Sequence, residues 1–424
     1  MLQTIRYGNR NNDVKILQSV LNKIGYGALV VDGVFSDNTL TAVKRFQRDY
    51  GLIPDGIVGV ETWKALERYL LGYTQYVIKA GDTFSSVAKK FHTTIPFIEA
   101  ANPNLVPTRL QIGQRIIVPY GIDVILDNVG YTYEVLDYNI RGLRARYPFI
   151  GVEIPGKSVL GRNLYVLKIG NGPNKVFYNA SHHALEWITS PLLMKWLENF
   201  AEGYVMNSIV KGYNIREIYE KSTIYIMPMV NPDGVELVIN GLKTTNPNYQ
   251  ELIRWNNGST NFSRTWEANN RGVDLNHNYN AAWEEYQQVQ RELGITGPAP
   301  SKYSGPFPES EPESKTTADF TRRINPRLVI AYHSQGEVIY WNFMNMETEE
   351  ARRIGDMLAR VSGYSLETTS GTASYTGYKD WFIKDYRRPG YTIEVGRGVN
   401  PLPISQLPKI YDENEELLLL AAIV

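Results

Sequence analysis

Residues 175–186 read KVFYNASHHALE, a short apolar run that ends in a turn carrying two histidines and a glutamate. Three later stretches have the same form, each a short apolar run bounded by turn residues: TIYIMPMV (223–230), LVIAYHS (328–334) and TIEVG (392–396). Stretches with helical spacing of apolar residues, such as EEARRIGDMLARVSG (349–363), alternate with these runs. The alternation predicts an α/β domain with a mixed central sheet flanked by helices.

The ends of the apolar runs are the first places to look for a site, because open α/β sheets bind ligands beyond the carboxyl ends of their strands. His183 and Glu186 follow the first run, and this spacing can place a nitrogen and a carboxylate on one cation. The pair alone is weak evidence, since an acid in the first turn of a surface helix has the same spacing. His333 ends another apolar run, where an imidazole needs a partner. Together the three residues predict a catalytic zinc site with one open position.

Zinc-dependent hydrolysis also needs a base for the attacking water and a cation for the developing oxyanion. Glu394 lies inside the apolar run TIEVG, where an ionised carboxylate is costly unless it faces a cation or water. The alternative for Glu394 is a simple pair with Arg397 at the end of the strand. Asp274, in RGVDLNHNY (271–279), is a candidate for orienting a ligand imidazole.

The composition limits the classes of partner. The chain has 424 residues, with 44 Lys and Arg against 44 Asp and Glu, five histidines and no cysteine. A metal site must therefore use histidines and carboxylates. The balanced charge predicts no nucleic-acid partner, and the longest apolar tract, 417–424, is far shorter than the roughly 20 residues that cross a bilayer, which predicts no membrane partner.

The N-terminus, MLQTIRYGNRNNDV, lacks the basic start and apolar core of a signal peptide. We therefore expect either that the protein is not exported by that route or that a signal has been removed from it.

Five motifs in order along the chain resemble those of the zinc metallocarboxypeptidases of the carboxypeptidase A type: H-x-x-E (183–186), N-P-D-G (231–234), G-V-D-L-N (272–276), H-S (333–334) and T-x-E (392–394). The resemblance spans about residues 130–424. It implies one zinc ion per chain held by His183, Glu186 and His333. It further implies Glu394 as the general base, Asp274 as the partner of His183, and Asn276 as a ligand of a substrate carboxylate. His182 does not fit the H-x-x-E spacing and is expected to have a packing or hydrogen-bonding role.

The chain departs from this family at the position that clamps the C-terminal carboxylate of a peptide. Where the family usually has Asn-Arg, this chain has Asn276-His277. Imidazole is mostly neutral at pH 7 and makes at most one hydrogen bond, whereas guanidinium makes a charged bidentate pair. Recognition of a free C-terminus should therefore be weakened.

Other roles that the resemblance implies have two candidates or two readings. The oxyanion arginine is Arg271 or Arg264, with Arg271 preferred, and Glu267 stands where relatives often carry a base. The tyrosine over the substrate is Tyr375 or Tyr378, of which we predict Tyr375. Lys379 falls at the position that sets side-chain preference in this family, where it would bind an anionic group; the alternative is an exposed loop lysine.

Residues 1–72 contain a weak repeat in which Asp-Gly, an apolar residue and a helical segment follow one another, at Asp32-Gly33 and Asp55-Gly56. Helical spacing predicts a small three-helix domain. The repeat resembles the peptidoglycan-binding-domain family, although Ser36 replaces one expected glycine, and implies a wall-binding domain; the alternative is a helical spacer.

Residues 74–120 predict a βααβ unit. Its motifs GDT (81–83), ANP (101–103) and LQIGQRIIVP (110–119) resemble a LysM domain, so residues 1–120 are expected to bind the N-acetylglucosamine of peptidoglycan glycan. His92 has no ligand at metal-binding spacing and is taken as structural. The catalytic domain is expected over 128–424.

Two wall-binding domains joined to a zinc hydrolase resemble the γ-D-glutamyl-L-diamino acid endopeptidases of spore-forming bacteria. With no signal peptide visible, the resemblance implies a protein in the cytoplasm, including that of a sporulating mother cell, or at the cell wall after release. This resemblance implies a peptidoglycan hydrolase that cuts muropeptide stems between γ-linked D-Glu and meso-diaminopimelate or L-Lys; the choice between these two stays open. One alternative is a metallocarboxypeptidase for ordinary L-peptides, against which His277 counts. The other is a wall-binding scaffold with an inactive peptidase domain, against which the complete set of ligands and base counts.

Overall fold

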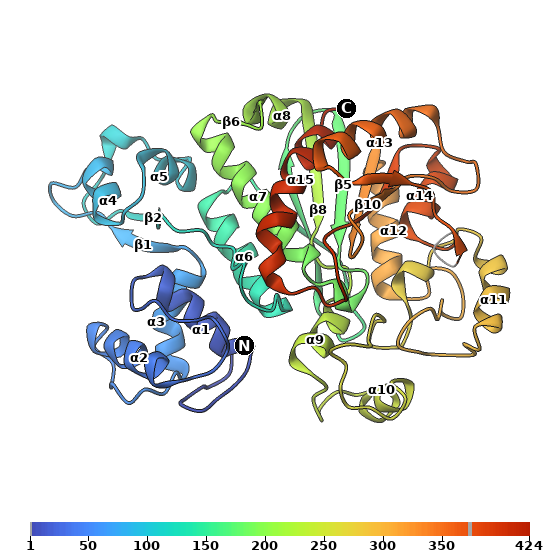
Figure 1. Cartoon of the computed structure of the whole chain (residues 1–424). Coiled ribbons are helices and arrows are strands. Elements are labelled where there is room, and N and C mark those ends of the chain that lie inside the picture. The colour runs from blue at the N-terminus through green and yellow to red at the C-terminus, as the bar shows by residue number, and fades with distance from the viewer. Residues whose placement is uncertain (1, 372–374) are drawn as a thin grey trace. The chain divides into compact units, whose positions relative to one another are not determined.

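The computed structural model describes residues 2–371 and 375–424 (Figure 1). These residues divide into two compact units, one formed by 1–151 with 197–207 and the other by 152–196 with 208–424. The expected boundaries at 72, 120 and 128 stay a prediction. No helix in the described ranges combines the length and the apolar composition needed to cross a membrane.

The first unit begins with three helices, α1 (Asn12–Lys23), α2 (Asp37–Asp49) and α3 (Val60–Leu70). The weak sequence repeat corresponds to a repeated hydrogen-bonding device. In the first copy the buried Gln18 accepts from the backbone of Gly33 at 2.9 Å and donates to Asp32 at 3.0 Å. Gln47 accepts from Gly56 at 2.9 Å and donates to Asp55 at 3.0 Å in the second copy.

Both glycines of the repeat have positive φ, +82° for Gly33 and +81° for Gly56, which is the left-handed region that glycine tolerates best. Each Asp-Gly turn is thus fixed by an amide that reaches it from the preceding helix. The predicted three-helix domain is confirmed.

The βααβ unit is also confirmed. Strands β1 (Tyr73–Val77) and β2 (Arg115–Pro119) pair antiparallel around helices α4 (Phe84–Lys90) and α5 (Ile95–Ala101) and the short η1 (Pro107–Arg109). Its core is a cluster of buried apolar side chains that includes Phe84, Val87, Ile98, Ile116 and Val118.

The first unit also contains α6 (Tyr133–Arg146) and the second half of α7 (Thr189–Met206). The buried Glu198 of α7 accepts hydrogen bonds from the backbone nitrogens of Val124 and Ile125 at 2.7 and 3.0 Å. Its carboxylate also lies 3.5 Å from the buried guanidinium of Arg146. The segment that follows the LysM-like region is therefore anchored inside this unit.

The second unit is built on a mixed sheet that has eight strands in the described residues, in the order β11-β10-β12-β9-β5-β8-β4-β3. The strands are β3 (Gly151–Lys157), β4 (Asn163–Gly170), β5 (Asn174–Ala180), β8 (Ser222–Met227), β9 (Leu328–His333), β10 (Val338–Tyr340), β11 (Ser365–Glu367) and β12 (Gly390–Glu394). β12, β9, β5 and β8 run parallel in the centre, whereas β4 and β10 pair antiparallel with β8 and β12. The small pair β6 (Ile209–Val210) and β7 (Tyr213–Asn214) lies apart from this sheet.

Neighbouring side chains of β5 pack against two different helices, α12 (Pro312–Ile324) and α15 (Leu407–Ala421), which are labelled in Figure 1. Phe177 of β5 lies 5.3 Å from Phe320 of α12 between ring centroids. The next residue, Tyr178, donates its hydroxyl to the carbonyl of Leu418 in α15 at 2.9 Å. Helices therefore flank the mixed sheet as predicted. The other α-helices of this unit are α8 (Ile215–Lys221), α9 (Pro232–Asn240), α10 (Tyr249–Trp255), α11 (Trp283–Glu292), α13 (Glu349–Ser362) and α14 (Tyr378–Tyr386). Three short helical turns are η2 (Ala184–Glu186), η3 (Leu275–His277) and η5 (Ile404–Gln406).

Candidate active site

The three predicted metal ligands meet at the carboxyl ends of two neighbouring strands. β5 and β9 are parallel and pair Ala180 with Tyr332, so His183 and His333 leave the sheet at the same edge. Glu186 ends η2, directly after His183. His333 Nδ1 lies 2.9 Å from a Glu186 oxygen and 3.3 Å from His183 Nδ1. His183 Nδ1 lies 3.0 Å from the other Glu186 oxygen.

These donor atoms suit a metal ion. Two imidazole nitrogens face each other across 3.3 Å, and a single proton is the most that could lie between them. Tetrahedral zinc with bonds of about 2.0–2.1 Å holds neighbouring donors about 3.3–3.4 Å apart, close to the spacings seen here. His183, Glu186 and His333 could therefore hold a metal ion, as their grouping indicates.

The electrostatics of this group favour a positive charge at its centre. Burial opposes a charged imidazole, yet Glu186 and Asp274 together raise the pKa of His183 well above its usual value. Burial alone would raise the pKa of Glu186, but the neighbouring His183 and His333 lower it to about 2. The negative charge of Glu186, which favours a proton on His183, would also favour a cation bound between these residues.

Asp274 lies behind His183, with its Oδ1 at 3.2 Å from His183 Nε2. The same carboxylate accepts hydrogen bonds from the backbone nitrogens of Asn276 at 3.1 Å and Lys302 at 2.8 Å. Burial would raise its pKa, but His183 and His277 lower it well below the usual range. An ionised Asp274 can thus fix the orientation of the His183 ring while Nδ1 faces the metal site.

Glu394 is the last residue of β12 and lies opposite His333 in the neighbouring strand. Burial, followed by the charges of Glu186 and Glu267, raises the pKa of Glu394 well above its usual value. A cation at the ligand group would oppose this shift, because nearby positive charge favours the carboxylate form.

A cavity of about 190 Å³ opens beside the ligands. Its walls contain seven of the residues expected at the site: His183, Asp274, Asn276, His277, Tyr375, Lys379 and Glu394. The expected metal ligand, base and substrate-binding residues are therefore neighbours, although they come from separate parts of the sequence.

His277 is held in place by its neighbours. Its ring stacks on Tyr286 with centroids 4.3 Å apart and planes at 8°. Its Nδ1 lies 2.9 Å from the Thr376 hydroxyl and 3.2 Å from the Tyr375 carbonyl oxygen, so the ring can donate to that carbonyl. Burial lowers the pKa of His277 below its ordinary value, with Asp274 opposing. A neutral imidazole therefore occupies the position where the family pattern has an arginine.

Lys379 is 2% exposed, so it is not an exposed loop lysine. Its Nζ donates to the carbonyl of Asn342 at 2.6 Å and pairs with the buried carboxylate of Asp380. Both members of this pair line the cavity. The cavity therefore offers a fixed positive group and a fixed negative group side by side.

Neither candidate for the oxyanion arginine lines the cavity. The guanidinium of Arg271 is half-exposed and lies 3.6 Å from Glu311, and the other candidate, Arg264, is exposed. Neither is among the residues that form the walls. The oxyanion role of an arginine stays a prediction that these positions do not favour.

The tyrosines and the second histidine have clear positions. Tyr375 lines the cavity, whereas Tyr378 is fully buried and its hydroxyl hydrogen-bonds that of Thr321 at 2.8 Å. His182 is also fully buried, with Nε2 2.9 Å from the Tyr279 hydroxyl. The packing and hydrogen-bonding role expected for His182 is confirmed.

Sequence reasoning missed several residues of the site. Lys302 and Asp380 line the cavity, and neither lies in a motif that would have pointed to it. Glu267, which the family resemblance had already marked, lines the cavity as well; burial, followed by Asp274 and Glu186 against the opposing effect of His183, raises its pKa to about 7. Asn400 donates to the Ser334 carbonyl at 2.6 Å and lies 3.4 Å from Glu186, where it can help to position that ligand.

The zinc carboxypeptidase family model matches residues 137–417. The chain belongs to this family. A peptidoglycan binding domain matches residues 10–66 and a LysM domain matches residues 76–119. The resemblances seen in the sequence are confirmed.

Two bacterial relatives cover most of this zinc carboxypeptidase. The chain is 42% identical over 283 residues to gamma-D-glutamyl-L-diamino acid endopeptidase 1 of Lysinibacillus sphaericus. The matched region covers 67% of this chain and 70% of that protein. It is 35% identical over 290 residues to the uncharacterized protein YqgT of Bacillus subtilis (strain 168), covering 68% and 76%. The solved structure of thrombin activatable fibrinolysis inhibitor matches with a TM-score of 0.54 at 16% identity, over 83% of this chain and 97% of that one, which supports the fold alone.

Proposed function

We propose that this metallopeptidase hydrolyses the amide bond between γ-linked D-Glu and the L-diamino acid of peptidoglycan stem peptides. The observation that carries the proposal is His277, a neutral ring tied to Thr376 and Tyr286 where a carboxylate clamp would stand. The relative that is 42% identical bears the name of this activity, and the chain carries two wall-binding domains.

In this proposal one zinc ion per chain is held by His183, Glu186 and His333. When bound, zinc supplies a Lewis acid that polarises the carbonyl and makes water acidic enough to attack near neutral pH. Asp274 keeps the His183 ring oriented for this role.

Glu394 performs the proton transfers. Its carboxylate takes a proton from the attacking water, whose oxygen bonds to the γ-carbonyl carbon of D-Glu. When the carbon–nitrogen bond breaks, the same proton passes to the leaving amine. The products are a free γ-carboxylate on D-Glu and a free α-amino group on the diamino acid.

Charged side chains in the cavity would orient the substrate. Lys379 and Lys302 are the two lysines among the described residues that line it, and the substrate carries carboxylates beyond the reacting amide. Tyr375 and Asn276 offer hydrogen bonds from the same walls. An amino-carboxylate head, as in meso-diaminopimelate, would suit the neighbouring charges of Lys379 and Asp380.

The test is digestion of defined peptides with analysis of the products by mass spectrometry. L-Ala-γ-D-Glu-meso-diaminopimelate and its L-Lys counterpart should be cut at the γ-amide, and extension of the stem by D-Ala should be tolerated. Preference for an α-linked L-Glu peptide would instead favour an ordinary metallocarboxypeptidase. Absence of turnover in zinc-loaded protein would favour an inactive scaffold.

The two N-terminal domains are proposed to hold the enzyme on peptidoglycan glycan through residues 1–120. The proposed place of action is the cell wall after release, or the cytoplasm of a sporulating mother cell. Fractionation of sporulating cells with an antibody to the chain tests this placement.

A further inference from the structure

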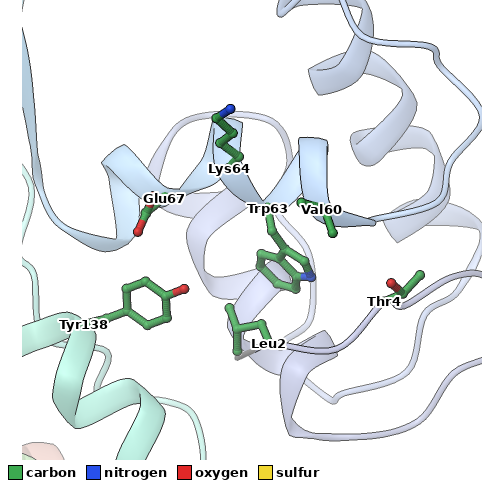
Figure 2. A pocket seen from close by; sticks show the side chains of 7 residues that line it. All are labelled: Leu2, Thr4, Val60, Trp63, Lys64, Glu67 and Tyr138. Atoms are coloured by element: carbon green, nitrogen blue, oxygen red, sulfur yellow. The ribbon is translucent and has the colours of Figure 1, made fainter.

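A second cavity, of about 330 Å³, is lined by residues of the first unit alone, and none of the residues that line the candidate active site is among them. Its walls come from the N-terminal segment, α3 and α6: Leu2, Thr4, Val60, Trp63, Lys64, Glu67 and Tyr138. The volume falls in the range of about 300–1,000 Å³ that is typical of small-molecule sites. Figure 2 shows Trp63 and Tyr138 approaching the cavity from different helices.

One side of this cavity is apolar. The indole of Trp63 lies beside Leu2 and Val60, as Figure 2 shows. The indole nitrogen already donates to the Gln3 carbonyl at 2.8 Å, so the ring can offer only its apolar surface to a ligand. Trp63 itself is 9% exposed, so only a small part of its indole borders the cavity, and Val60, which is 70% exposed, adds open apolar surface at the rim.

The opposite side is polar. Figure 2 shows the hydroxyl of Tyr138 pointing toward the space in front of Trp63 and Leu2. No hydrogen-bond partner of this hydroxyl occurs among residues 2–371 and 375–424. Burial, followed by the charge of Glu67, raises the pKa of Tyr138, which keeps the hydroxyl protonated as a donor.

An ion pair joins the walls from the two helices. Glu67 of α3 accepts a hydrogen bond from Arg141 of α6 at 2.9 Å, and the Arg141 guanidinium lies 5.3 Å from the centre of the Tyr138 ring. Both α3 and α6 therefore contribute to the walls of the cavity. The peptidoglycan binding domain match ends at residue 66, so it includes Trp63 but neither Glu67 nor Tyr138.

We infer that this cavity binds one N-acetylated hexosamine ring of a peptidoglycan glycan strand. A sugar ring has an apolar face of C–H groups and a periphery of hydroxyl and amide groups. The first matches the apolar wall of Leu2, Val60 and the accessible part of Trp63, and the second matches the polar groups of Tyr138, Glu67 and Thr4. A purely apolar ligand would leave the Tyr138 hydroxyl without a partner, which is unfavourable.

The inference rests on the proposed wall-binding role of the N-terminal region and adds a specific place for it. It also gives a physical reason for the presence of α6 in the same compact unit. An isolated domain that ended at residue 72 would lack one wall of the cavity.

The experiment uses the full chain labelled with 5-fluorotryptophan and a soluble N-acetylglucosamine–N-acetylmuramic acid tetrasaccharide without stem peptides. Trp63 is the first of eight tryptophans and the next is Trp187, so no tryptophan lies in the LysM-like region. The Trp63 signal, assigned with Trp63→Phe, therefore reports on this cavity even if the LysM domain binds the same probe. Titration should shift this signal.

Two variants test the walls. Val60→Arg places a long side chain across an exposed edge of the cavity and should weaken the titration of Trp63 at least about tenfold. Ile53→Arg is the matched control, because Ile53 is 79% exposed in the same domain and does not line the cavity. Tyr138→Phe removes only the hydroxyl and should weaken binding about three- to tenfold.

A Trp63 signal that does not move at millimolar tetrasaccharide would overturn the inference, as would a shift that Val60→Arg leaves unchanged. A shift produced by the stem peptide L-Ala-γ-D-Glu-meso-diaminopimelate instead of the sugar would also overturn it, in favour of a peptide site. Hydrolysis of that peptide is measured in parallel. It should be equal in all these variants, so failure of the catalytic proposal would be seen separately from failure of the sugar site.

Discussion

His277→Arg should convert an enzyme that tolerates extended stems into one that prefers a free carboxylate on the diamino acid. The new side chain can keep the stacking on Tyr286, since a planar guanidinium stacks on an aromatic face as imidazole does. It loses the short contact between Nδ1 and the Thr376 hydroxyl, 2.9 Å in the parent, at a cost of about 1 kcal/mol.

In His277→Arg the new interaction with substrate should outweigh the lost Thr376 contact only for substrates that have a free carboxylate on the diamino acid. A charge-assisted pair with a carboxylate contributes about 1.5–3 kcal/mol, or about 10- to 100-fold in kcat/KM. The assay measures kcat/KM for the tripeptide L-Ala-γ-D-Glu-meso-diaminopimelate and for the tetrapeptide that adds D-Ala. In the parent the two values should lie within about threefold of each other, and in His277→Arg the tripeptide should be preferred at least about tenfold.

His277→Gln is the matched control, because it is neutral and can still donate one hydrogen bond. In His277→Gln the ratio of kcat/KM for the tripeptide to kcat/KM for the tetrapeptide should stay near that of the parent. If His277→Arg folds, binds zinc and yet shows the parental ratio, position 277 does not face the substrate carboxylate. A parent that strongly rejects the tetrapeptide would refute the endopeptidase proposal itself.

Three further predictions concern the metal, the base and the N-terminal repeat. His333→Ala should lose most of the single equivalent of zinc found in the parent by metal analysis; unchanged zinc would remove His333 from the ligand set. Glu394→Gln should keep zinc and the circular dichroism of the parent but lose about 10²- to 10⁴-fold in kcat, because an amide cannot accept the proton; activity within tenfold of the parent would assign the base to another carboxylate. Gln18→Leu should destabilise the first three helices by about 1–3 kcal/mol, because the buried Gly33 N–H loses its partner, whereas the exposed Asp32 can bind water instead; amide hydrogen exchange in α1 and α2 should speed up accordingly, while protection in the central sheet should not change.

The sequence was sufficient to predict that His183, Glu186 and His333 lie together, because their positions depend on the sheet. Once four apolar runs are taken as neighbouring strands, the residues at their carboxyl ends must lie at one edge, and His183, His333 and Glu394 do. Asp274 was found through a motif outside the strands. Its contact with His183 depends on how a long loop returns to the sheet, which the motif alone could not show.

The residues that sequence reasoning missed come from loops or depend on the tertiary fold. Lys302 lies in the loop between α11 and α12 and lines the cavity, and no short-range pattern encodes the path of that loop. Gln18 and Gln47 were missed for a different reason. An internal glutamine in an amphipathic helix usually faces solvent, and only the fold shows that both are buried against an Asp-Gly turn.

Asp274 explains how the metal site and the substrate-binding walls can be built from such different kinds of sequence. Its carboxylate contacts His183 through one oxygen and the backbone nitrogen of Lys302 through the other, while the backbone nitrogen of Asn276 also donates to it. The contacts to Asn276 and Lys302 use backbone groups, so they place few demands on the side chains at those positions. The loops can therefore present a histidine at 277 and a lysine at 302 toward the cavity without disturbing the carboxylate that orients His183. On this argument, substrate preference can change through loop side chains while the metal ligands and their support stay the same.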